Sequence, residues 1–183
     1  GINAFFFEKG NVLRTEFSSD IAEKLYPYLL LFDTGGNRES HKIQRGFLDL
    51  TEEQTQKLHS IKLLAKKAFS FIVKEEVHNL GILLHNAWML KKASNVGIAN
   101  QRINDLYHIA RGQGAVGGKI LGAGGCGYMV FWVPFARQDA VIHRLEKEDC
   151  EHIIYYPDTR GLEVKKLSEL TYFVQAMVLA WVL

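Results

Sequence analysis

A glycine-rich segment is the strongest chemical signal in the 183-residue sequence. Residues 112–127 read GQGAVGGKILGAGGCG and hold eight of the sixteen glycines. Glycine adopts backbone conformations that other residues avoid, so the run marks a local demand on the backbone. Such a run can expose N–H groups to an anion or to another backbone, and Lys119 within it would add a positive charge. The alternative is structural: the glycines let a helix and a strand pack closely around a tight connection.

Two GxGxxG patterns occur in this segment, at 112–117 and 122–127. In dinucleotide-binding folds a strand precedes the pattern and a helix follows it, so that the pyrophosphate meets the helix N-terminus. Here the flanking sequence predicts the reverse order. A Walker A phosphate loop is also excluded, because Gln113 stands where that motif needs its first glycine and Ile120 where it needs Ser or Thr.

A second group of candidate residues lies on one face of a predicted helix. His85, Trp88 and Lys92 are three and four residues apart, which places them on the same side. An aromatic ring could cover the apolar face of a sugar, and a cation could bind its phosphate. The alternative is a Trp at the edge of the core beside solvated lysines. Arg38 and Lys42 could bind a phosphate from a loop.

Composition and charge exclude several classes of protein. Hydrophobic residues make up 48% and charged residues 23% of the chain, as in globular domains and unlike disordered or fibrous chains. The net charge of +2 argues against nucleic-acid binding. Cys126 and Cys150 are too few for a disulfide scaffold and indicate a reducing cytoplasm. No HxxxH or HExxH pair points to a metal site, and no signal peptide is recognised.

The elements that must hold these residues follow one another irregularly. The pattern predicts a hairpin, a buried strand, a helix that starts at the capping box of Thr51, two further helices, a strand, a helix and a last strand. We expect the hairpin at 2–8 and 12–17, the buried strand at 28–34 and a loop or short helix at 37–50. The three helices are expected from 51 to a break at 74–76, over 80–95 and from Asn100 onward. The strand, helix and last strand that follow are expected at 128–133, 137–147 and 152–156. Helices grouped in this way favour an α+β fold with a mostly antiparallel sheet.

Residues 118–128 (GKILGAGGCGY) closely resemble the third signature motif of the GHMP small-molecule kinases. The stretch 29–35 resembles the family's strand before a substrate-side loop. The stretch 80–92, with Gly97-Ile98, Ile103, Leu106 and Tyr107, resembles the heptose-phosphate kinase branch, which is similar to fucokinases. The opening Gly1-Ile2-Asn3 resembles a strand of the same branch. Cys126 stands where the family has glycine, and Asp33 where the branch more often has an aromatic residue. The resemblance covers residues 1–160; the apolar tail 161–183 falls outside it, and its stretch 170–183 is shorter than the about 20 residues of a membrane span.

The resemblance implies a ferredoxin-like α+β fold with helices on one face of an antiparallel sheet. It also implies an enzyme that transfers the γ-phosphate of ATP, with Mg²⁺, to a sugar hydroxyl. The residues that it places near the phosphate or the substrate are Lys119, Gly122, Ala123, Gly124, Gly125 and Gly127; the substrate-binding candidates are Thr34, Arg38, Trp88, Lys91 and Lys92.

The family's catalytic acid and its Pro- and Ser-rich phosphate loop have no counterpart in the sequence. Glu75 and Glu76 are adjacent and point in different directions on a helix, so they do not form a metal-binding pair. We therefore expect no catalytic residue here and an N-terminal kinase domain as partner, with self-association of the chain as a further expectation. The alternative is a non-catalytic α+β module that binds or regulates.

Overall fold

The computed structural model describes residues 2–35, 51–94, 98–122, 124–156 and residue 158. In chain order the elements are β1 (Asn3–Glu8), β2 (Asn11–Glu16), α1 (Ser19–Leu25), β3 (Leu29–Asp33), α3 (Glu52–Val73), α4 (Leu80–Ser94), α5 (Gln101–Gly112), β4 (Gly117–Ile120), β5 (Tyr128–Trp132), α6 (Gln138–Glu146) and β6 (Glu151–Ile153). The predictions for residues 37–50 and for the tail at 161–183 lie outside the described residues.

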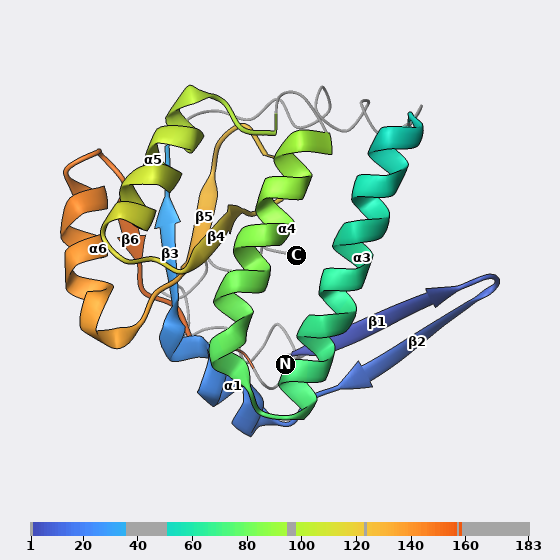
Figure 1. Ribbon diagram of the computed structural model, residues 1–183. Coiled ribbons are helices and arrows are strands. Elements are labelled where there is room, and N and C mark those ends of the chain that lie inside the picture. The colour runs from blue at the N-terminus through green and yellow to red at the C-terminus, as the bar shows by residue number, and fades with distance from the viewer. Residues whose placement is uncertain (1, 36–50, 95–97, 123, 157, 159–183) are drawn as a thin grey trace, which may run out of the picture.

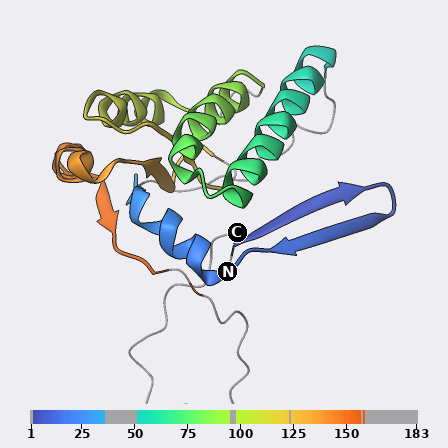
Figure 2. The ribbon, with the colours of Figure 1, turned by 60° about the horizontal axis from the view of Figure 1, so that its bottom comes forward.

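Four strands form an antiparallel sheet in the order β4-β5-β3-β6. Helices separate β3 from β4, and α6 separates β5 from β6, so the chain follows the β-α-β-β-α-β order of a ferredoxin-like fold. Figures 1 and 2 show α5, α4 and α3 side by side in one layer, with α4 and α5 above a face of the sheet. The predicted α+β class with an antiparallel sheet and helices on one face is confirmed.

The main hydrophobic core lies between this sheet and the helices α4, α5 and α6. Alternate residues of β3 face it, since Leu30 and Phe32 are buried while their neighbours are half-exposed, as strand geometry requires. The largest of the fully buried side chains are Trp88, Tyr107, Phe32 and Phe131. A smaller cluster joins Ile21 and Leu25 of α1 to Trp132.

The helix starts match the sequence signals. Thr51 and Gln54 form the predicted capping box at the start of α3, and the side chain of Asn100 accepts a hydrogen bond from the amide of Ile103 at the start of α5. The predicted break after the first long helix is also confirmed, because Glu75 has a φ of 60°. Within the described ranges, no helix is long and apolar enough to cross a membrane.

Two elements were missed by the sequence reading. The sequence patterns predict neither a helix nor a strand where α1 lies, although α1 buries Ile21, Ala22 and Leu25. Strand β4 lies inside the glycine-rich segment, where a continuous connection was expected; Gly117–Ile120 instead pair with β5. Gly117 and Gly118 serve the packing, because a Cβ on Gly117 would lie 2.0 Å from the carbonyl oxygen of Gly81 on α4. The structural interpretation of the glycines therefore holds for Gly117 and Gly118.

The predicted hairpin is confirmed and forms a sheet of its own. Strands β1 and β2 pair only with each other among the described strands, and Figure 1 shows their tip projecting from the body of the molecule. Phe6 and Phe17 contact Phe69 of α3, with ring centroids 5.1 and 5.6 Å apart respectively. Phe5 and Phe7, on the other face, remain 55% and 77% exposed.

Candidate functional site

The connection between β4 and β5, residues 121–127, is called the glycine loop below. Its glycines Gly122, Gly124, Gly125 and Gly127 have φ angles of 72°, 103°, 81° and 101°. Residues with a Cβ rarely adopt such angles. The glycines in this part of the sequence are therefore explained by a backbone conformation that only glycine adopts without strain.

The start of helix α5 holds one side of the glycine loop. The amide of Gly125 donates to the carbonyl of Ile98 over 2.9 Å, and Asn100 Nδ2 donates to the carbonyl of Gly125 over 2.7 Å. At Gly124 there is no room for a side chain, since a Cβ there would lie 2.7 Å from the Ile98 oxygen. Asn100 thus caps its own helix and binds the loop with the same side chain.

The end of strand β3 holds the other side of the loop. The backbone amide and the hydroxyl of Thr34 both donate to the carbonyl of Gly127, over 2.8 and 2.6 Å. Thr34 is 2% exposed, and its own carbonyl accepts from Arg102 Nε over 3.1 Å. The sequence predicted Thr34 as a substrate-binding residue; in this geometry its hydroxyl is used to position the loop.

One lysine contacts the glycine loop, and a second precedes the loop in strand β4. Lys91, in the last turn of α4, donates to the carbonyl of Gly122 over 3.5 Å. Lys119 lies half-buried on β4, immediately before the loop. Burial lowers the pKa of Lys119; burial and then the charge of Lys119 lower the pKa of Lys91. The structure thus brings the predicted residue Lys91 into contact with the predicted loop glycine Gly122.

Several amides of the glycine loop have no acceptor among the residues that the structure describes. Gly122, Gly124 and Gly127 donate no backbone N–H to any other described residue. Backbone N–H groups that a turn leaves without an acceptor can bind an anion. Lys91 brings one ammonium group to the same loop.

The predicted sugar-facing role of Trp88 is corrected by its position. Its side chain is only 1% exposed and packs in the core, so it offers no ring face to a ligand. Helical spacing correctly predicted that Trp88 and His85 lie on the same side of the helix. That side faces the core, where His85 Nδ1 lies 2.6 Å from the hydroxyl of Tyr107. Lys92 is engaged there too, since it donates to Asn104 over 3.1 Å and lies 5.8 Å above the Trp88 ring.

Arg38, Lys42 and Ala123 fall outside the described residues. Three functional positions were missed by sequence reasoning: Ile98, Arg102 and the second role of Asn100. Asn100 carried a signal as a helix cap, whereas Ile98 acts through its backbone and was noted only as part of the family resemblance. Among the described residues, no three His, Cys, Asp or Glu side chains gather to hold a metal ion.

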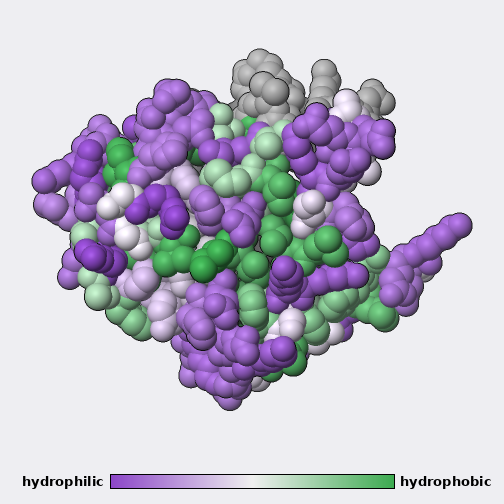
Figure 3. Space-filling view, in the orientation of Figure 1, coloured by the Kyte–Doolittle hydropathy of each residue, from purple (hydrophilic) through white to green (hydrophobic). Residues whose placement is uncertain are grey.

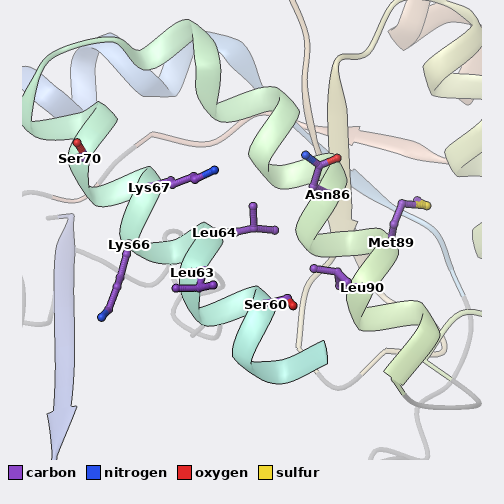
Figure 4. Close-up of a pocket in the computed structure, with 9 residues that line it drawn as sticks. All are labelled: Ser60, Leu63, Leu64, Lys66, Lys67, Ser70, Asn86, Met89 and Leu90. Atoms are coloured by element: carbon purple, nitrogen blue, oxygen red, sulfur yellow. The ribbon is translucent and has the colours of Figure 1, made fainter. Parts of the chain in front are cut away.

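An apolar groove between α3 and α4 is a separate feature. Figure 3 shows hydrophobic side chains between these helices with hydrophilic ones around them. The groove has a volume of about 740 Å³ and is lined mainly by Leu63, Leu64, Met89 and Leu90. In Figure 4, Leu64 and Leu90 point into the space between the helices, and Lys66 points away from it. None of its lining residues belongs to the glycine loop.

The fold and the glycine loop agree with a family match. Residues 65–152 match the family described as GHMP kinases C terminal, and the chain therefore contains a GHMP kinase C-terminal domain. The match includes α4, α5, β4, the glycine loop and β5. It confirms the resemblance seen in the sequence for this part of the chain; the predicted outer bounds at residues 1 and 160 stay a prediction.

A curated relative and two solved structures are similar over a longer range. The chain is 30% identical over 131 residues to the D-glycero-alpha-D-manno-heptose 7-phosphate kinase of Campylobacter jejuni, a match that covers 70% of this chain and 38% of that protein. The mevalonate kinase of Methanococcus jannaschii has a TM-score of 0.62 at 19% identity, over 77% of this chain and 43% of that one. A D-glycero-D-manno-heptose 1-phosphate kinase from Bacteroides thetaiotaomicron has a TM-score of 0.56 at 20% identity, over 84% and 41%.

The two structures support the fold alone at these identities. The chain spans only about two fifths of the length of the curated relative, since the match covers 38% of it. The activity of a complete kinase is therefore not carried over to this chain by similarity.

Proposed function

We propose that this chain is the C-terminal part of an ATP-dependent sugar kinase, similar to the heptose-phosphate kinases, that transfers the γ-phosphate of ATP to a sugar hydroxyl. The observation that carries the proposal is the glycine loop, whose left-handed glycines are held from two sides by Thr34 and Asn100. The heptose 7-phosphate kinase of Campylobacter jejuni supports a phosphorylated heptose as the substrate class.

The part of this chain in the reaction is to bind and orient. Phosphoryl transfer depends on positioning and on neutralising charge more than on covalent chemistry by the protein. A rigid loop with free amides, next to Lys91 and Lys119, serves both needs at a phosphate. In this proposal the catalytic acid and the main ligands of ATP and Mg²⁺ belong to an N-terminal kinase domain, because the described residues hold no carboxylate cluster.

We place the reaction in the cytoplasm. Cys126 and Cys150 are free thiols, which fits a reducing compartment. The partners in this proposal are the sugar phosphate and the N-terminal domain.

The test uses the complete product of the reading frame that contains these residues. We expect it to convert D-glycero-D-manno-heptose 7-phosphate in the presence of ATP and Mg²⁺, with a new phosphate signal in phosphorus NMR and one ADP released for each sugar phosphorylated. Galactose and mevalonate serve as alternative acceptors. A product that binds these ligands without turnover of ATP on any of them would contradict the proposal and favour a non-catalytic binding module.

A further inference from the structure

Helix α3 has an apolar side that the described residues cover only in part. It is the longest of the described helices, with 22 residues, yet none of these residues is fully buried. Figures 1 and 2 show α3 at the outer end of the helical layer, with α4 as its neighbour in that layer. Helices in proteins are stabilised mainly by the packing of an apolar side. Helix α3 therefore has room for a further packing partner.

The groove between α3 and α4 is fixed at both ends. Near the start of α3, Lys57 Nζ donates to the carbonyl of Ala93 over 2.9 Å. Near the other end, Ile72 of α3 and Leu84 of α4 pack against the same hydrophobic cluster. The groove lies between these two attachments. It is therefore a feature of the packed helices and not the result of a frayed helix end.

The lining of the groove is apolar and continuous. Single exposed apolar residues are common on protein surfaces, but Leu63, Leu64, Met89 and Leu90 line one cavity of about 740 Å³. Leu64 and Leu90 point into it, and Lys66 points away (Figure 4). The described residues that line the cavity include no Asp or Glu. Such a lining suits an uncharged apolar segment.

The sequence contains a segment of this kind. Residues 170–183 (LTYFVQAMVLAWVL), called the tail segment below, include no Asp, Glu, Lys or Arg. They lie outside the described residues. Burial of apolar surface is favourable by about 25 cal/mol per Å². An apolar surface within reach of the tail segment would therefore bind it.

The chain is long enough to bring the tail segment to the groove. Leu170 follows Asp158, the last described residue, by 12 positions, and an extended chain of this length spans about 40 Å. A folded unit of about 150 residues has a radius of gyration of about 15 Å. The groove extends along α3 from Ser60 to Ser70, about 15 Å, and 14 residues span about 21 Å even as a helix.

We propose that the tail segment binds in the groove between α3 and α4 and completes the cover of α3. The exposed face of the hairpin, with Phe5 and Phe7, is the competing surface. The groove is favoured because two helices enclose a bound segment from two sides, whereas the hairpin face covers it from one side. The tail segment therefore buries more apolar surface in the groove.

Trp181 in the tail segment reports on this contact. The sequence has three tryptophans, and both Trp88 and Trp132 are buried in the fold. Quenching of tryptophan fluorescence by acrylamide therefore measures the exposure of Trp181. It is recorded at a concentration at which light scattering shows a monomer. We expect the parent to be quenched no more than Trp181→Phe, because all three indoles are shielded.

Leu63→Arg places a charge in the groove at a position that is 48% exposed, so the fold itself should tolerate the change. We expect quenching of Trp181 to rise about threefold or more, because burying the guanidinium against an apolar segment is costly. Val73→Arg is the matched control. Val73 lies on the same helix, is 60% exposed and does not line the groove, so this variant should be quenched like the parent.

A truncation after Glu169 tests the same contact without a substitution in the groove. Exposed hydrophobic surface binds the dye ANS. Removal of the tail segment should raise ANS fluorescence, because the groove is uncovered, and should lower the melting temperature. If the tail segment were free in solution, its removal would instead lower ANS fluorescence and leave the melting temperature unchanged.

The outcomes separate the groove from other positions of the tail segment. Trp181 shielded in the parent and in Val73→Arg but quenched in Leu63→Arg, with more ANS fluorescence after truncation, supports the proposal. Trp181 accessible in the parent, or less ANS fluorescence after truncation, overturns it. Shielding that persists in Leu63→Arg, or that is lost only in Phe5→Thr/Phe7→Thr, places the segment elsewhere and also overturns it. No measurement involves phosphoryl transfer, so the proposed kinase activity is tested separately.

Discussion

Gly124 carries two constraints that no other residue type can meet together. Its φ of 103° disfavours any side chain, and a Cβ would lie 2.7 Å from the Ile98 oxygen. We expect Gly124→Ala to lower the free energy of unfolding by about 1–3 kcal/mol, through strain and the forced separation of two backbones. Urea unfolding followed by circular dichroism measures the change.

Gly112→Ala is the matched control, because a Cβ there has nothing within 4 Å and φ is not positive. It should leave stability unchanged or raise it by up to about 1 kcal/mol, since alanine favours a helix. Cys126→Gly, which restores the residue typical of the family motif, should also be tolerated. Equal losses in Gly124→Ala and Gly112→Ala would show that the close approach to Ile98 is not a constraint.

His85 makes stability depend on pH. Burial, followed by the charges of Arg111 and Lys92, holds its pKa below the ordinary value of 6.5. As pH falls through 6.5 towards the lower folded value, the unfolded chain takes up a proton that the folded chain does not, so stability decreases. Above pH 6.5 the contribution is fully present.

We expect His85→Gln to reduce the difference in unfolding free energy between pH 7.5 and pH 5. His152 has a pKa lowered by burial and acts in the same direction, so part of the difference should remain. Urea unfolding at the two pH values is the measurement. An unchanged pH dependence in His85→Gln would mean that this histidine does not contribute.

The sequence predicts the site at residue scale only in part. The glycine run could be found because left-handed backbone restricts the choice of residue so strongly. The error at Trp88 has a physical cause: spacing shows which residues share a helix face, but not whether that face meets the core or a ligand. Arg102 donates hydrogen bonds to the carbonyl groups of Thr34 and Glu148, which lie on two segments distant along the chain. Sequence spacing does not show which distant segments come together in the fold.

At the scale of elements, the N-terminus of α5 and the glycine loop are joined through Asn100. Its Oδ1 accepts from the amide of Ile103, and its Nδ2 donates to Gly125. Asn100→Ala should lower stability by about 0.5–2 kcal/mol, the usual effect of losing a helix cap. Asn100→Asp keeps the cap, since Asp is as good a capping residue, but removes the donor to the loop.

We therefore expect Asn100→Asp to leave amide exchange in α5 nearly unchanged and to speed it at Gly125. Hydrogen exchange followed by NMR separates the two effects. Faster exchange throughout α5 in the Asp variant would show that the loop contact, rather than the cap, maintains the helix start.

Elements with strong local signals were predicted well, and those that depend on distant partners were not. The capping box at Thr51 and the apolar run of β3 indicate their structures by themselves. Strand β4 contains two glycines in four residues and has little strand propensity of its own. It exists because β5 supplies hydrogen bonds and because only glycine at position 117 lets α4 approach. Single-sequence patterns do not contain that information.

At the scale of the whole molecule, the hairpin leaves a hydrophobic face open. Phe5 and Phe7 are 55% and 77% exposed, beside Val12 at 53%. Exposed apolar patches promote association. We expect the chain to self-associate at high concentration and the double variant Phe5→Thr/Phe7→Thr to remain monomeric, as measured by light scattering against concentration.

The melting temperature of this double variant should match that of the parent, because neither ring is buried. Phe6→Thr is the contrasting variant: its ring packs against Phe69, so it should lower the melting temperature and leave association in place. If the parent is monomeric at every concentration tested, the hairpin face does not drive self-association.

The chain by itself is expected to lack kinase activity. The proposal assigns the catalytic acid and the phosphate loop to another domain, and the described residues hold no metal-binding cluster. A coupled assay with ATP, Mg²⁺ and heptose 7-phosphate should give the same rate for the 183-residue chain and for Lys119→Ala, both at background. Turnover above that control would locate a catalytic centre within this chain.

The attachment of the glycine loop also has a consequence for folding. The bond from the Thr34 hydroxyl to Gly127 joins residues 93 positions apart, and that from Asn100 to Gly125 joins residues 25 apart. Contacts between residues distant along the chain form slowly, because a large loop must close first. The loop can take its final shape only after β3 has joined β5 and α5 has docked, so its left-handed backbone is acquired late in folding and is absent from an incompletely folded chain.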